Sequence, residues 1–277
     1  MLYLIIVGIF SVCIGSFLNV VIYRLPKILK NQWRLECLEF LKVPDNKPTE
    51  NFSLAFPRSH CPLCKTTIPF WHNIPLLSFI LLGGKCSHCH AKISIRYPIV
   101  ELLSALLAIY AAYRFGLSWQ TFEVLIFTWC LLALVFIDLQ HKLLPDQITL
   151  SLLWIGLLSN LQAQFASLSS AVIGAISGYC FMWSVAWVFR KIRKIEGMGY
   201  GDFKLTAALG AWIGWQLLPL LIILASFIGA IVGITQILIK KQSRTTQIPF
   251  GPYLALAGWV TLFWGEPIMR WYWHIMR

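Results

Sequence analysis

The sequence has 277 residues, of which 58% are hydrophobic and 12% are charged, whereas soluble domains are about 45–50% hydrophobic and about 25% charged. The mean hydropathy is +0.71, and the apolar residues occur in long runs. This composition excludes a water-soluble globule and indicates the lipid bilayer as the solvent. The net charge of +12 is therefore interpreted as a topology signal, and no nucleic-acid partner is expected.

The apolar segments predict an all-α integral membrane protein with about eight transmembrane helices. The first, residues 1–23, lacks the basic residues that precede a secretory signal core, so we expect a retained span with its N-terminus outside. Seven more segments follow at 98–113, 121–137, 144–161, 168–189, 203–218, 219–239 and 249–265. Segment 203–218 is shorter than the ~20 residues of a straight span, so a re-entrant or tilted helix stays open there.

The Lys and Arg residues predict the orientation. With eight alternating spans, 20 of the 23 basic residues fall in loops on one side, which is expected to be cytoplasmic. Residues 24–97 form the largest of these loops and are polar and cysteine-containing. The sequence is accordingly divided into a first span (1–23), a cytoplasmic cysteine domain (24–97) and a polytopic helical domain (98–277).

Four cysteines of that loop form two CxxC pairs, Cys61 with Cys64 and Cys86 with Cys89, separated by 21 residues. Two such pairs supply the four thiolates of a tetrahedral Cys₄ zinc site, which is usually structural. Disulfides are the competing interpretation, and a reducing cytoplasm disfavours them. The neighbouring histidines His60, His88 and His90 are expected to be surface residues.

Acidic residues number only eleven, so each one in or near a span is informative. Asp138 and Asp202 both lie at helix ends on the predicted cytoplasmic side and could face each other. Two close carboxylates can share a proton, so that one activates water while the other polarises a carbonyl. Asp146 is interpreted as a helix N-cap in preference to a catalytic acid. Glu101 is the other candidate for an assisting role.

The sequence resembles the type IV prepilin peptidases, bifunctional leader peptidases and N-methyltransferases, over nearly its whole length. The motifs that carry the resemblance follow one another in the family's order: residues 15–21, 24–26, the four-cysteine loop, 96–98 with 101, 137–138 with 143–146, 199–204 and 249–252.

This resemblance implies an intramembrane aspartyl protease of the GxGD type, with Asp138 and Asp202 as the catalytic pair. It implies that the enzyme cleaves type IV prepilins and pseudopilins after a glycine that ends a basic leader. It also implies methylation of the new N-terminal residue, commonly Phe, from S-adenosylmethionine, zinc on the four cysteines, and the cell inner membrane as the location. No residue is assigned to S-adenosylmethionine, because no Rossmann-type motif is present, and no oligomeric state is indicated.

Two alternatives stay open at this stage. In a proton-coupled transporter the two aspartates would carry protons, although acids at cytoplasmic helix ends and the lack of an inverted repeat disfavour this. The other alternative is a peptidase without methyltransferase activity.

Overall fold

The computed structural model describes residues 1–44, 52–194, 197–240 and 249–276. These residues form helices joined by loops and contain no β-strand, apart from two isolated β-bridges in the cysteine region. The all-α prediction is therefore confirmed for the described residues. The chain divides into two compact units, Met1–Ala133 and Leu134–Arg277.

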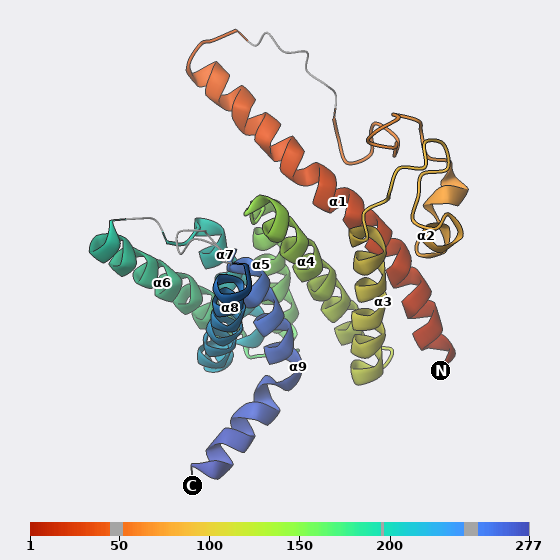
Figure 1. Cartoon of the computed structure of the whole chain (residues 1–277). Helices are drawn as coiled ribbons and strands as arrows, with labels where there is room; N and C mark the ends of the chain where they lie inside the picture. Colours follow the sequence, from red (N-terminus) through yellow and green to blue (C-terminus); the bar gives the residue numbers. More distant parts are fainter. Residues whose placement is uncertain (45–51, 195–196, 241–248, 277) are drawn as a thin grey trace. The chain divides into compact units, whose positions relative to one another are not determined.

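The first unit is built on two helices that lie side by side, α1 (Leu2–Phe40) and α3 (Arg96–Phe115) (Figure 1). They approach closely because Gly15 has no side chain: a Cβ there would lie 2.8 Å from the Cα of Glu101. The Ser104 hydroxyl also donates a hydrogen bond to the Ser11 carbonyl at 2.7 Å. The unit is completed by the short helices η1 (Phe70–Asn73) and α2 (Leu77–Leu81) and the first part of α4 (Trp119–His141).

The length of α1 differs from the prediction. Residues 24–40 were expected to belong to a loop domain, but they continue the first helix to Phe40. Most of them are Lys, Leu, Arg and Glu, which favour helix formation, and this preference outweighs the polarity that suggested a loop. Arg24 is buried within this helix and donates hydrogen bonds to the carbonyls of Ser53, Leu54 and Pro57.

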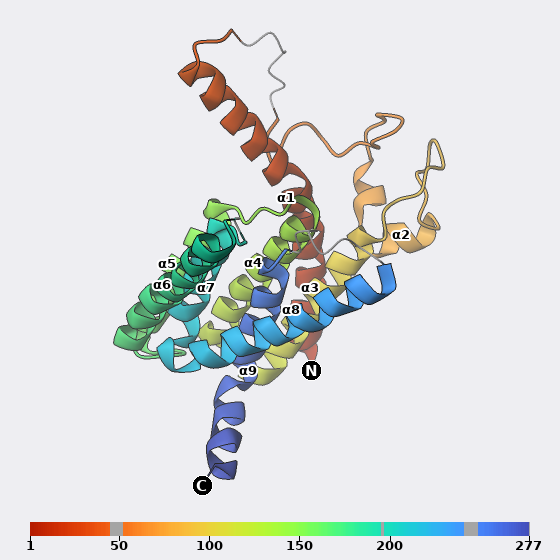
Figure 2. The ribbon, with the colours of Figure 1, turned by 60° about the vertical axis from the view of Figure 1, so that its left-hand side comes forward.

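The second unit surrounds one short helix, α7 (Tyr200–Ile213). Helices α5 (Asp146–Ser159), α6 (Leu168–Arg193) and α9 (Gly251–Ile275) all contact it, and α5, α6 and α7 lie side by side in Figure 2. Gly174 of α6 and Gly210 of α7 face each other backbone to backbone, so the two helices pack without side chains between them. The remaining elements are η2 (Asn160–Gln162), η3 (Trp215–Leu217) and α8 (Leu218–Lys240).

The C-terminal end of α7 is held by one buried side chain, Asn160. Its amide nitrogen donates to the carbonyls of Ala211 and Trp212, and its amide oxygen accepts from the backbone N–H groups of Phe165 and Ala166. The helix then stops at Gly214, whose φ of +75° is accessible to glycine. The expected 203–218 segment is thus a 14-residue helix that starts at Tyr200, followed by a break.

Five helical segments are long and apolar enough to cross a membrane: α1, α3, α4, α6 and Trp215–Gln236. Helices α5 and α7 have 14 residues each, or about 21 Å, which is less than the ~30 Å apolar layer of a bilayer. The chain is therefore a multi-pass membrane protein, and the count of eight spans stays a prediction.

Candidate active site and metal-binding cysteines

Asp138 lies in the last turn of α4, and its side chain is 5% exposed. Its carboxylate accepts a hydrogen bond from the backbone N–H of Gly251, the first residue of α9. A Cβ at Gly251 would lie 2.6 Å from Asp138 Oδ2, so this close approach requires glycine. The start of α9 is thus a direct neighbour of the first aspartate.

Asp202 is the third residue of α7, and its side chain is 8% exposed. The Gly199 backbone N–H donates a hydrogen bond to the carboxylate, while the Asp202 N–H donates to the Gly199 carbonyl at 3.1 Å. Burial raises the pKa of Asp202 to about 7, and the charge of the nearby Asp138 carboxylate contributes in the same direction. The structure therefore brings the two predicted aspartates within electrostatic reach of each other.

One leucine packs against the glycines that neighbour both acids. A Cβ at Gly201 would lie 2.8 Å from the Cβ of Leu144, and a Cβ at Gly251 would lie 3.1 Å from both of its terminal methyl carbons. Leu144 is 8% exposed. This side chain fills the space where the starts of α7 and α9 come together, next to Asp202 and Asp138 respectively.

The acids lie beside an apolar cluster that explains their dry surroundings. Phe203, the neighbour of Asp202, packs with Met182 and Ala186 of α6 and is 2% exposed. The cluster is extended by three partly buried side chains, Tyr179, Met198 and Phe250. Because charged carboxylates are poorly solvated beside apolar side chains, such an environment favours a pair that holds one proton between its two members.

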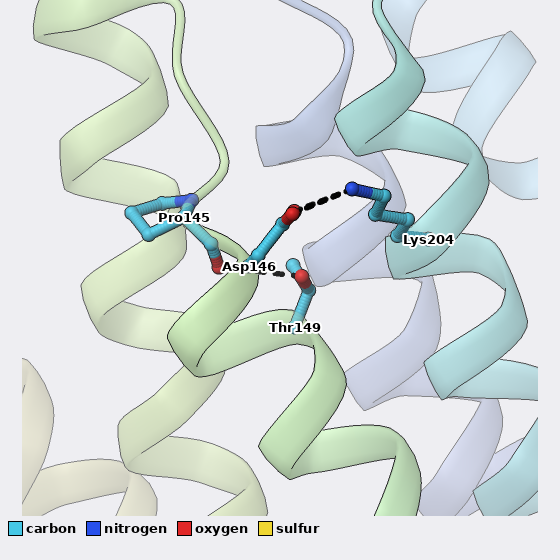
Figure 3. Close-up of polar contacts among 4 residues, drawn as sticks. All are labelled: Pro145, Asp146, Thr149 and Lys204. Atoms are coloured by element: carbon cyan, nitrogen blue, oxygen red, sulfur yellow. Dashed lines mark hydrogen bonds and ion pairs between the residues drawn. The ribbon is translucent and has the colours of Figure 1, made fainter. Parts of the chain in front are cut away.

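Asp146 has a different position from the one predicted. The N-cap of α5 is Pro145, and Asp146 is the first helical residue and makes no side-chain cap hydrogen bond. Its carboxylate instead binds Lys204 of α7, with Nζ 2.8 Å from Oδ1 and 2.6 Å from Oδ2 (Figure 3). The cap interpretation is wrong because a tertiary partner, which the local sequence does not reveal, binds the carboxylate.

Glu101 lies in the first unit, within α3, and is 6% exposed. Its Oε2 atom accepts a hydrogen bond from the backbone N–H of Leu76 at 2.8 Å. Leu76 has a positive φ of 60° and caps α2. The observed contact of Glu101 is thus a structural one, to the loop that follows the first cysteine pair.

The four CxxC cysteines come together in the first unit. The sulfur atoms of Cys61, Cys64, Cys86 and Cys89 all lie within 4.8 Å of one another, and those of Cys61 and Cys89 are 3.7 Å apart. Four thiolates about 2.3 Å from a central ion have their sulfur atoms about 3.8 Å apart, so this donor set fits a tetrahedral metal ion. None of the four forms a disulfide.

The two cysteine pairs fold in the same way, which explains why they converge. Each loop is closed by an isolated β-bridge, His60 with Thr67 in one and Lys85 with Lys92 in the other. The residue after each second cysteine, Lys65 and His90 respectively, has a left-handed backbone. As predicted, His88 and His90 are exposed, while His60 is partly buried.

The thiol of Cys64 is chemically suited to binding a metal. Side-chain and backbone hydrogen bonds from Thr66 lower the pKa of this thiol to about 6. The thiolate is the form that binds metal ions, so this cysteine favours the ligand form at neutral pH.

Sequence reasoning missed two features of the acidic site, the packing of Leu144 and the pairing of Lys204 with Asp146. Gly251 was noticed only as part of a motif. Glycine beside two prolines at the start of an apolar segment could have signalled a helix start at which the backbone touches another group.

Two buried carboxylates in a helical chain with several membrane-crossing segments define a polytopic membrane protein with an acidic site. Residues 9–115 match the family model described as the bacterial peptidase A24 N-terminal domain, and residues 125–234 match the model of the type IV leader peptidase family. The chain belongs to this family.

Curated relatives cover nearly the whole chain, and each is described as a prepilin leader peptidase/N-methyltransferase. The protein of Aeromonas salmonicida strain A449 is 52% identical over 273 residues, which is 98% of this chain and 94% of the relative. The Pseudomonas aeruginosa protein is 51% identical over 94% of this chain and 89% of its own length, and that of Legionella pneumophila is 46% identical over 96% and 93%. No solved structure matches the chain.

Proposed function

We propose that this protein removes the basic leader from type IV prepilins and pseudopilins with Asp138 and Asp202, and then methylates the new N-terminus. Cleavage after a glycine, with Phe as the usual methylated residue, is part of this proposal. The observation that carries the peptidase assignment is the meeting of two buried carboxylates, with Asp138 contributing to the raised pKa of Asp202. The names of the full-length relatives support both activities.

The geometry supports hydrolysis by a shared proton. The ionised carboxylate takes a proton from a water molecule, whose oxygen attacks the carbonyl carbon of the scissile peptide bond. The protonated carboxyl donates a hydrogen bond to the carbonyl oxygen as negative charge develops there. Transfer of a proton to the leaving nitrogen breaks the C–N bond and releases the leader carboxylate and the new N-terminal amine.

A capping role for the aspartates is the simpler alternative. Asp202 occupies the third helical position and binds the N-cap N–H, which is also what an ordinary acidic capping residue does. A cap needs one acid and leaves it open to water, whereas here two buried acids lie near each other at an electrostatic cost. Catalysis explains that cost, because a carboxyl that stays protonated near neutral pH is useful as an acid.

The basic residues support cleavage at the cytoplasmic face of the inner membrane. Helix α6 ends with Arg190, Lys191 and Arg193 just before the segment that leads to Asp202. Residues 45–51, 195–196 and 241–248, which contribute to the basic loops of the charge count, lie outside the described residues. A prepilin with a basic leader would place that leader in the cytoplasm, with its apolar helix in the lipid and its cleavage site at the interface.

Zinc is the ion we assign to Cys61, Cys64, Cys86 and Cys89. A closed set of four cysteines is typical of structural zinc, and the ion when bound would stabilise the fold of the loop. We assign the cysteine-bearing part of residues 24–97 to methyl transfer and residues 98–277 to peptide cleavage.

Methyl transfer requires S-adenosylmethionine as the donor. The described residues contain no strand–glycine loop–helix unit of the Rossmann kind. No residue is therefore assigned to this cofactor, and no step is derived through it.

Mass spectrometry of a prepilin after incubation with the purified membrane enzyme tests both activities. With S-adenosylmethionine, the mature chain should carry one added methyl group, and without it the chain should be cleaved only. Asp138→Asn and Asp202→Asn should each abolish cleavage, whereas the exposed Glu266 provides a matched control, Glu266→Gln, that should cleave normally. Near-normal cleavage by either aspartate variant would disprove the catalytic pair.

A further inference from the structure

The ion pair of Asp146 and Lys204 connects the starts of two helices beside the acidic site. Asp146 is the first residue of α5, and Lys204 follows Asp202 by two positions in α7 (Figure 3). Lys204 Nζ contacts both carboxylate oxygens of Asp146, at 2.8 and 2.6 Å. No other ion pair of comparable geometry between two helices is found in the described parts of the second unit.

Stability is a weak explanation for this pair. The Asp146 side chain is 51% exposed and that of Lys204 is 29% exposed. Ion pairs with this much access to water contribute little to folding, because water screens their attraction and ordering two side chains costs entropy. Lys204 also lies near the N-terminal end of α7, where the helix dipole disfavours a cation. The location of the pair, and not its strength, is its informative property.

Residues two apart on a helix do not face each other, so Lys204 does not share the side of α7 that Asp202 uses. Leu144 packs against Gly201, the residue before Asp202, and Asp146 binds Lys204, two residues after it. The start of α7 is thus held on both sides of Asp202 by one short segment, residues 144–146.

This segment is stiff. Pro145, between Leu144 and Asp146, restricts the backbone, and its carbonyl accepts hydrogen bonds from the backbone N–H and the hydroxyl of Thr149 (Figure 3). Leu144 also packs against Gly251, whose N–H binds Asp138. A single rigid segment therefore contacts the neighbours of both catalytic carboxylates.

We infer that Asp146 and Lys204 are positioning residues, which hold Asp202 at the separation from Asp138 that the shared proton requires. This inference rests on the proposed peptidase function. It predicts that the pair acts on the rate of bond cleavage and not on substrate binding, because neither residue needs to touch the prepilin. It also predicts that the two residues act as one unit, since losing either partner releases the same contact.

The test is a double-mutant cycle in full-length protein, with kcat and KM for prepilin cleavage measured separately. Asp146→Asn and Lys204→Met should each lower kcat about tenfold or more, with KM changed by less than about twofold, since small displacements of catalytic groups slow the chemical step. The double variant should be no slower than either single one. Ser151→Ala, at an exposed position of α5, is the matched control and should keep the normal kcat.

Each other outcome has a clear meaning. Normal kcat in both single variants, additive losses in the double variant, or a raised KM with unchanged kcat would overturn the positioning role. Asp202→Asn, assayed beside them, separates this inference from the proposed function: if it still cleaves, the catalytic pair itself is wrong. Thermal unfolding of every variant in the same detergent should show a Tm close to that of the unmodified protein, and a Tm lowered as far as kcat would assign the pair to stability instead.

Discussion

The backbone N–H of Gly251 donates a hydrogen bond to the carboxylate of Asp138, at a place where no side chain fits between them. Gly251→Ala would put a methyl group 2.6 Å from Asp138 Oδ2, so the acid or the start of α9 must shift. We expect kcat for prepilin cleavage to fall about tenfold or more, because a displaced acid no longer matches its partner.

The control for this substitution is Gly8→Ala in α1. There the new Cβ would meet the end of the Ile109 side chain at 2.9 Å, and that side chain can rotate away. Gly8→Ala should retain normal cleavage. Equal activity of Gly251→Ala and the unmodified enzyme would show that the Gly251 contact has no role in the reaction.

The pH dependence of cleavage follows from the raised pKa of Asp202. Because burial and the Asp138 charge raise this pKa to about 7, the acid keeps its proton up to near-neutral pH and loses it above that. The reaction also needs one ionised carboxylate, which is lost when both acids are protonated. A plot of kcat/KM against pH should therefore be bell-shaped, with its alkaline limb falling above about pH 7. A rate that stays flat from about pH 6 to about pH 9 would contradict a shared-proton mechanism.

Metal analysis tests the cysteine cluster independently of activity. We expect about one equivalent of zinc per chain purified under reducing conditions. Cys61→Ser should lose most of it, because three thiolates bind the ion less tightly than four. Cys37→Ser, which removes an exposed cysteine outside the cluster, should retain the metal. Zinc content unaffected by Cys61→Ser would place the ion elsewhere.

Asn160→Ala should destabilise the second unit. It removes four hydrogen bonds from a side chain that is 0% exposed and leaves the carbonyls of Ala211 and Trp212 unpaired. Buried polar groups without partners are costly, so we expect a loss of about 2–4 kcal/mol, seen as a lowered Tm in detergent. Ser151→Ala, whose hydroxyl binds only the Gln147 carbonyl of its own helix, should leave Tm nearly unchanged.

Much of the architecture and both candidate sites could be predicted because they depend on local patterns. Long apolar runs predict helices, and two CxxC pairs predict one Cys₄ cluster. Asp138 and Asp202 stood out because acids are rare in this chain and costly near lipid.

The features that were not predicted all depend on tertiary contacts. Asp146 follows a proline before an apolar run, which suits an N-cap, and only the fold brings Lys204 to it. Gly251 shows its importance only when α9 is placed beside Asp138. The extension of α1 to Phe40 was missed because polarity was interpreted as a loop, although polar residues form helices readily.

The burial pattern of α7 determines how a peptide can reach Asp202. Among the residues of this helix, only Tyr200, Gly201 and Lys204 are not fully buried, and all three lie within its first five positions. The flanks of α7 are covered by α5, α6 and α9, so its long sides offer no approach to a second chain. A prepilin must therefore come to the aspartate along the axis of the helix, from beyond its N-terminal end.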